Sequence, residues 1–191
     1  MQNGKFVREL LKLLPAFGEI KGRLIFEPPV EHILVGFAWE KPRGGIYIYT
    51  FVYPLFDMMD FIHLGYSDRL RPPAEWIPDI GQTEQSMAEQ FVQIVEPYRM
   101  AVSNLRELSA FVEFMRARDL QNPLIRRGFA LSLIVSGDQS EARVQLELCL
   151  RAAHNREFEL GIVDLIRKLD AGIAAETLLA RELKFRAGLR I

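Results

Sequence analysis

The sequence has few of the residues from which most catalytic and metal sites are built, because its 191 positions hold one cysteine and three histidines. His32, His63 and His154 fall in no HxH or HExxH pattern, and no CxxC occurs, so the usual zinc-ligand spacings are absent. The GxSxG nucleophile elbow and the glycine-rich phosphate loop are also absent. We therefore predict no metal and no cofactor, and the lack of catalytic motifs favours a protein that is not an enzyme.

The single cysteine, Cys149, cannot form an internal disulfide, so the sequence gives no indication of an oxidising compartment. It lies in an apolar helical stretch, and His154 follows five residues later, a spacing that does not place two residues on one helix face. A free cysteine in such a position behaves as a small hydrophobic residue. We predict a buried structural thiol.

Neither an excess of one charge nor a long apolar run is present. The chain has 24 basic and 25 acidic residues, for a formal net charge of −1, which argues against general binding to nucleic acid. No stretch approaches the roughly 20 apolar residues of a membrane-spanning helix. Arg8, Glu9 and Lys12 interrupt the apolar positions near the N-terminus, unlike a signal peptide. We expect a cytoplasmic protein without a membrane contact.

Hydrophobic periodicity separates a β-rich first third from a helical remainder. Apolar positions at helical spacing over residues 5–14 predict an N-terminal helix that ends at Pro15. Period-two patterning then predicts four strands, at residues 23–27, 30–40, 46–53 and 61–66. From Thr83 onward the pattern is helical, and Pro97 is expected to kink or break the first of these helices.

These elements predict an α+β fold, in which an N-terminal helix and a four-stranded antiparallel meander pack against a mostly helical C-terminal half. We expect one compact domain over residues 1–191, with a helix and sheet at 1–66, a long loop at 67–82 and helices at 83–191. Several consecutive helices of similar length also suggest a helical repeat. No positions recur between them beyond the apolar spacing, which disfavours that interpretation.

Tyrosine and tryptophan side chains gather on the predicted sheet and in the loop that follows it. Such residues favour interfaces, because they combine apolar area with a polar tip. The aromatic sheet face also contains Phe51, which favours the alternative that helices cover this face as a core surface. Stacking on single-stranded RNA would require interleaved basic residues, which the strand IYIYTFVY lacks. The interface candidates are Trp39, Tyr47, Tyr49, Tyr53 and Trp76.

A second group of residues could line a pocket for a small molecule. Asp57, Asp60 and His63 recur at every third position, and on a helix they would offer two carboxylates and an imidazole to a metal. Because residues 61–66 are expected to form a strand, His63 should be separated from both aspartates, so we do not predict a metal site there. A pocket between sheet and helices would be lined by His32, Tyr49, Asp57, His63 and Arg71.

The sequence supports two hypotheses about function. The first is a non-catalytic intracellular protein-interaction module, of the immunity or accessory type, that binds a protein through the aromatic sheet face, a sheet edge or the loop at 65–83. Self-association through an open sheet face or edge is a variant of it. The second is a small-molecule-binding protein or hydrolase-like enzyme. The first requires exposed aromatic surface, and the second requires a pocket with a histidine and a carboxylate within hydrogen-bond reach.

Overall fold

The computed structural model describes residues 3–20, 23–40, 45–70 and 81–191. The chain forms two compact units, the first from residues 1–53 and 66–106 and the second from residues 54–65 and 107–191. Each unit therefore takes its chain from two separate stretches of sequence. That both units together form one compact domain stays a prediction.

The first unit contains two helices and an antiparallel sheet. The helices are α1 (Asn3–Leu13) and α2 (Glu84–Asn104). The sheet has the strand order β1-β2-β3-β4-β5, so strands that are neighbours in the chain are also neighbours in the sheet. The strands are β1 (Gly18–Ile20), β2 (Leu24–Phe26), β3 (Ile33–Glu40), β4 (Tyr47–Pro54) and β5 (Asp68–Arg69). The predicted N-terminal helix and antiparallel meander are confirmed.

One of the four predicted strands is wrong. Residues 61–66 form bends and turns instead of a strand. Residues 54–65 belong to the helical unit, where helices offer no free backbone groups for a sheet ladder. The two edges of the sheet are formed by β1 and β5, which are only three and two residues long.

The pairing of β2 with β3 depends on a glycine. Phe26 lies opposite Gly36, and Ile25 lies opposite Phe37. A Cβ atom at Gly36 would lie 2.0 Å from the carbonyl oxygen of Ile25 and 2.8 Å from the Cα atom of Phe26. Because both are backbone atoms of the neighbouring strand, the close approach requires a residue without a side chain.

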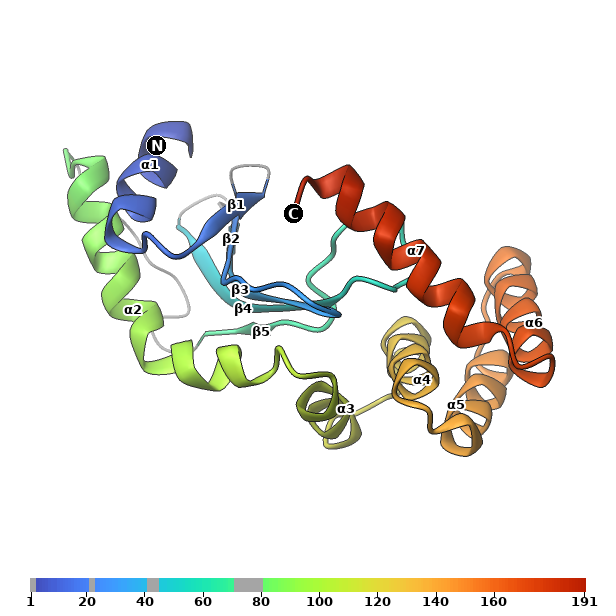
Figure 1. Ribbon diagram of the computed structural model, residues 1–191. Helices are drawn as coiled ribbons and strands as arrows, with labels where there is room; N and C mark the ends of the chain where they lie inside the picture. The colour runs from blue at the N-terminus through green and yellow to red at the C-terminus, as the bar shows by residue number, and fades with distance from the viewer. Residues whose placement is uncertain (1–2, 21–22, 41–44, 71–80) are drawn as a thin grey trace. The chain divides into compact units, whose positions relative to one another are not determined.

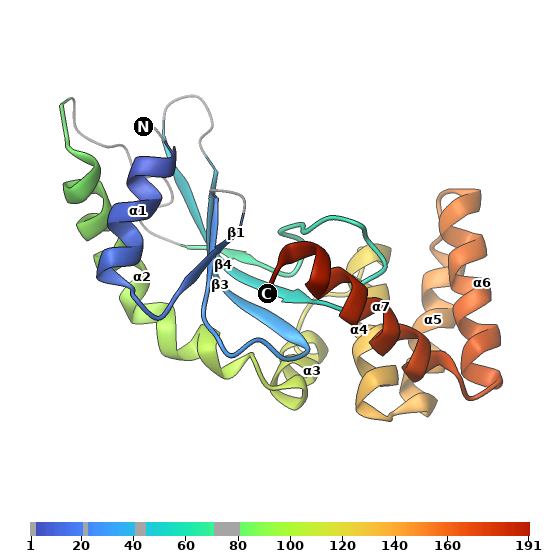
Figure 2. The ribbon, with the colours of Figure 1, turned by 45° about the horizontal axis from the view of Figure 1, so that its top comes forward.

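The core of the first unit lies between the sheet and its two helices, which run side by side along the sheet (Figures 1 and 2). Phe6 of α1, Trp39 of β3 and Phe91 of α2 meet edge to face, with ring centroids 5.4–5.9 Å apart. All three side chains are buried. Each element thus contributes one aromatic ring to a shared cluster, which joins both helices to the sheet.

Helix α2 continues through Pro97 for 21 residues, so the proline does not break it. The axis of α2 bends in its second half (Figure 1), as expected of a helix that contains a proline. Thr83 caps the start of the helix, because its side chain accepts a hydrogen bond from the amide of Ser86.

The second unit is built on helices, which confirms the predicted helical C-terminal half. They are α3 (Leu108–Arg116), α4 (Pro123–Ser136), α5 (Gln139–Arg151), α6 (Arg156–Asp170) and α7 (Ala174–Leu189). Helix α4 is buried on nearly all sides and contacts α3, α5 and α7, while α6 contacts α5 and α7. Across the described ranges, the helices are too short or too polar to cross a membrane.

Candidate functional site

The irregular segment 54–65 is held in the helical unit through Asp57, whose side chain is fully buried. Its Oδ1 accepts a hydrogen bond from Nη2 of Arg127 on α4 at 3.0 Å, and its Oδ2 lies 3.1 Å from Nε2 of His63. Arg127 is itself 7% exposed. A buried carboxylate is tolerated only when its charge is paired and its oxygens are hydrogen-bonded, and both conditions are met here.

The tautomer of His63 follows from the groups that face its two ring nitrogens. The backbone amide of Gly65 donates a hydrogen bond to Nδ1 at 3.1 Å, so Nδ1 carries no proton. Nε2 then carries the hydrogen and donates a hydrogen bond to Oδ2 of Asp57. In a catalytic His–Asp pair the second ring nitrogen faces a nucleophile. Because both nitrogens of His63 are engaged within the chain, this pair supports the segment and is not placed to act as a general base.

Arg181 of α7 holds the same segment at two further points. Its Nε donates to the backbone carbonyl of Asp57, and its Nη2 donates to Oδ1 of Asp60, both at 2.8 Å. Each aspartate that could have attracted a metal is therefore paired with an arginine. In the described part of the chain, histidine, cysteine, aspartate and glutamate side chains form no cluster that could hold a metal ion.

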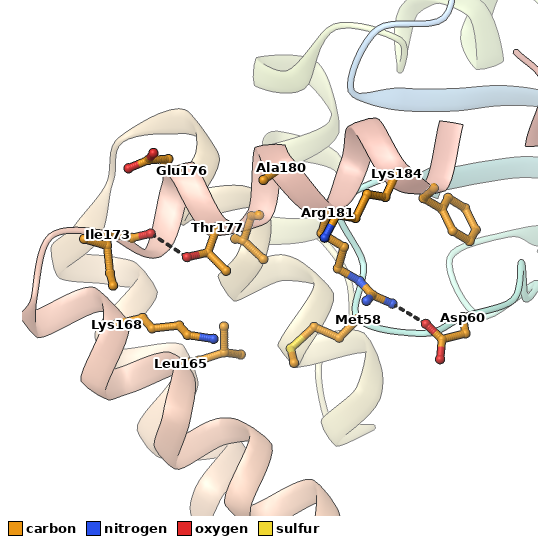
Figure 3. A pocket seen from close by; sticks show the side chains of 12 residues that line it. Met58, Asp60, Leu165, Lys168, Ile173, Glu176, Thr177, Ala180, Arg181 and Lys184 are labelled. Carbon is orange, nitrogen blue, oxygen red and sulfur yellow. Dashed lines mark hydrogen bonds and ion pairs between the residues drawn. The ribbon is translucent and has the colours of Figure 1, made fainter. Parts of the chain in front are cut away.

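A groove of about 850 Å³ lies in the second unit, between α6, α7 and the segment at Met58 and Asp60. Figure 3 shows Leu165 and Lys168 from α6, Thr177 from α7 and Met58 directed toward the same space. The hydroxyl of Thr177 donates to the carbonyl oxygen of Ile173 at 2.9 Å, so its methyl group remains for the groove. The centre of the groove is therefore mainly apolar.

Basic side chains border this apolar centre. Three of them line the groove (Lys168, Arg181 and Lys184), against the two acidic residues Asp60 and Glu176. Arg181 is engaged by Asp60, and Lys168 is paired at 2.7 Å with Asp164, which does not line the groove. Lys184 has no ion-pair partner among the residues that the structure describes. The groove thus has an excess of positive charge and one cation that is free to meet a ligand.

The predicted aromatic interface does not form one exposed face in the described residues. Trp39 is 2% exposed, in the cluster with Phe6 and Phe91, and Tyr53 is fully buried against Phe51 and Tyr66. These two candidates are core residues, because α1 and α2 cover the rings of β3 and the end of β4 is buried.

Tyr47 and Tyr49 are half-buried at the other end of β4. The guanidinium of Arg69 lies 3.4 Å above the ring of Tyr47. The hydroxyl of Tyr49 donates to Glu40 at 3.0 Å, and burial together with this bond raises the pKa of Tyr49. The remaining interface candidate, Trp76, lies outside the described residues.

The predicted small-molecule pocket is divided between the two units. His32 and Tyr49 belong to the first unit, Asp57 and His63 belong to the second, and Arg71 lies outside the described residues. The expected separation of His63 from Asp57 is wrong, because residues 61–66 turn instead of extending as a strand.

The sequence interpretation did not identify the arginines that determine this region, Arg127 and Arg181. A signal for Arg127 exists, because it lies in the apolar segment PLIRRGFALSLIVS, where a charge requires a buried partner. Nothing comparable marks Arg181 or Lys184, which lie on a helix with ordinary charge content.

Cys149 is fully buried, and burial raises the pKa of its thiol to about 12. Because the thiolate is the reactive form, we expect Ellman's reagent at neutral pH to react with the folded protein at least about 100 times more slowly than with the urea-unfolded protein. The release of the coloured thiolate measures both rates. Equal rates in the two states would contradict the structural assignment of this cysteine.

Two regions of the second unit thus combine charged and apolar side chains. The polar groups around Asp57 bind other parts of the same chain, whereas the groove along α7 has an unpaired cation and open apolar surface. Comparisons of the chain with protein-family models, curated proteins and solved structures found no match. The candidate site is therefore the groove, on the basis of its own geometry.

Proposed function

We propose that the protein is a non-catalytic protein-interaction module, of the accessory or immunity type, whose binding surface is the groove along α7. The observation that carries the proposal is an open groove of about 850 Å³ with an apolar centre and a basic border. Protein interfaces combine a mainly apolar core with a polar rim, and arginine and aromatic residues are favoured there. The groove therefore has the composition of a docking surface.

The length of the groove supports a protein segment as its ligand. One face of α7 lines the groove, with Thr177, Ala180 and Lys184 at helical spacing, and Ile173, the residue just before the helix, extends this face. At about 1.5 Å per residue, this face is about 16 Å long, or three helical turns. Small-molecule sites enclose most of their ligand, whereas an elongated surface open to solvent suits a peptide or helix laid along it.

The arrangement of polar groups supports a binding role over a catalytic one. The buried carboxylate and the imidazole of the second unit, in Asp57 and His63, bind each other and groups of the same chain. Their chemistry is used to hold the segment that supplies Met58 and Asp60 to the groove.

Filling the groove should abolish binding of the partner. Ala180 is exposed and lines the groove, so Ala180→Trp adds a large ring there and removes no buried contact. We expect native mass spectrometry of the full chain, enriched gently from its source cells, to show a stoichiometric protein partner. The ratio of partner-bound to free chain should fall at least about tenfold in the variant, which corresponds to about 1.4 kcal/mol of binding free energy.

Val144→Trp is the matched control, because Val144 is 53% exposed on α5 and does not line the groove. It should retain the partner at the wild-type level. Equal retention by both variants would place the interface elsewhere, and a small ligand bound in place of a protein would overturn the proposal.

A further inference from the structure

We infer that the segment bound in the groove is an acidic amphipathic helix, with its carboxylates directed toward the Lys184 end of α7. The inference rests on the proposed function and adds the chemistry and the orientation of the partner. It follows from three features of the groove: its charge, the arrangement of that charge along α7, and the size of the side chains on the α7 face.

The charge of the groove determines the sign of the partner. Lys184 is exposed and has no ion pair within the described ranges, and Lys168 shares its charge with an exposed carboxylate, that of Asp164. A cationic partner would bring its charge against these lysines, and like charges at an interface cost several kcal/mol. An anionic partner gives Lys184 the carboxylate that its own chain does not provide.

The charge is also unevenly placed along the helix. Glu176 lies in the first turn of α7, close to Ile173, while Arg181 and Lys184 lie about one and a half and two turns further on. Ile173 is 47% exposed, so the first turn offers apolar surface beside a carboxylate. A bound segment should therefore place its acidic side chains near Lys184 and apolar side chains near Ile173.

The side chains in the middle of this face favour a helix. Thr177 and Ala180 are small, and the hydroxyl of Thr177 is already bonded to its own helix. Small residues allow two helix axes to approach closely, while the partly exposed Met58 supplies apolar contact from the wall opposite α7. The apolar stripe of an amphipathic helix matches such a surface, as in other helix-in-groove complexes.

The test uses two fluorescein-labelled synthetic helices of roughly 14 residues, long enough to cover the α7 face. Both have leucines at i, i+3, i+4 and i+7, and their polar positions are glutamate in one and lysine in the other. Fluorescence anisotropy with the full-length chain at low salt should show the glutamate peptide binding at least about ten times more tightly than the lysine peptide.

Lys184→Glu should weaken binding of the glutamate peptide about tenfold and strengthen binding of the lysine peptide, because it reverses the unpaired charge. Arg167→Glu is the control, since Arg167 is exposed on α6 and does not line the groove, and it should change neither affinity by more than about twofold. The orientation is tested with a glutamate peptide whose carboxylates are confined to one half and a dye on Ile191→Cys, in a Cys149→Ala background. Energy transfer to this dye should be higher from a label at the acidic end than from a label at the other end, and equal or reversed transfer would overturn the orientation.

Equal binding of the two peptides, or an unchanged affinity in Lys184→Glu, would overturn the acidic-helix inference. If Ala180→Trp still removed the natural partner in that case, the proposed function would stand and only the acidic-helix inference would fail. Displacement of the glutamate peptide by millimolar dodecanoate, combined with a natural partner that Ala180→Trp does not affect, would overturn both proposals and indicate a site for apolar carboxylates.

Discussion

Replacing Asp57 with alanine is expected to lower the free energy of unfolding of the second unit by about 3–5 kcal/mol, because the guanidinium of Arg127 would stay buried without its partner. Arg127 is 7% exposed, and its Nε atom already has no hydrogen-bond partner. The loss of Asp57 also removes the acceptor of His63. Urea denaturation followed by far-UV circular dichroism measures the change.

Asp60→Ala provides a matched control on the same segment. Asp60 also accepts a hydrogen bond from an arginine, but its side chain is 93% exposed, so its loss should cost at most about 1 kcal/mol. The double variant Asp57→Ala, Arg127→Met should recover part of the stability lost in Asp57→Ala, since it removes the unpaired charge. Similar losses for Asp57→Ala and Asp60→Ala would contradict the buried role of Asp57.

Local sequence patterns predicted those elements whose neighbours are close in the chain. The alternation over residues 46–53 became β4, and the apolar segment after Asn122 became the buried helix α4. The pattern at 61–66 was equally short, but its surroundings are helices from far along the chain. A strand pattern requires a free neighbouring edge, and the sequence does not show whether one is present.

The candidate site was less predictable, because its contacts join residues that are distant in sequence. Asp57 and His63 were both named as pocket candidates, although they were expected to lie apart. Their partners lie still further along the chain, because Arg127 is 70 residues from Asp57 and Arg181 is 124 residues from it. Periodicity places a residue on a face of its own helix but does not identify the element that faces it. The groove is lined by residues of α6, of α7 and of the segment at 54–65, so no single stretch of sequence contains all the residues that form it.

Aromatic content on its own did not distinguish core from interface. Trp39 and Tyr53 have the composition of interface residues, but helices and neighbouring rings bury them. The groove has few aromatic residues, and its evidence for binding is an unpaired lysine beside apolar side chains. The proposed interaction therefore moves from the sheet to α7, while its non-catalytic character remains the proposal that the sequence suggested.

Replacing Phe91 with alanine should destabilise the first unit by about 3–5 kcal/mol, because it leaves a cavity between both helices and the sheet. Phe91 is fully buried, with its ring 5.9 Å from that of Phe6 and 5.5 Å from that of Trp39. Edge-to-face pairs contribute about 0.5–1.5 kcal/mol beyond the buried area. Urea denaturation in a Trp76→Phe background, where Trp39 is the sole tryptophan, reports unfolding of this unit by fluorescence.

Met100→Ala tests whether that loss is specific to the aromatic cluster. Met100 lies on the same helix, α2, but is 78% exposed, so its truncation should change the free energy of unfolding by less than about 0.5 kcal/mol. In Phe91→Ala the emission of Trp39 should also shift to longer wavelength in the folded state, because its ring loses an apolar neighbour. An unshifted spectrum with full stability would mean that the two helices and the sheet do not share this core.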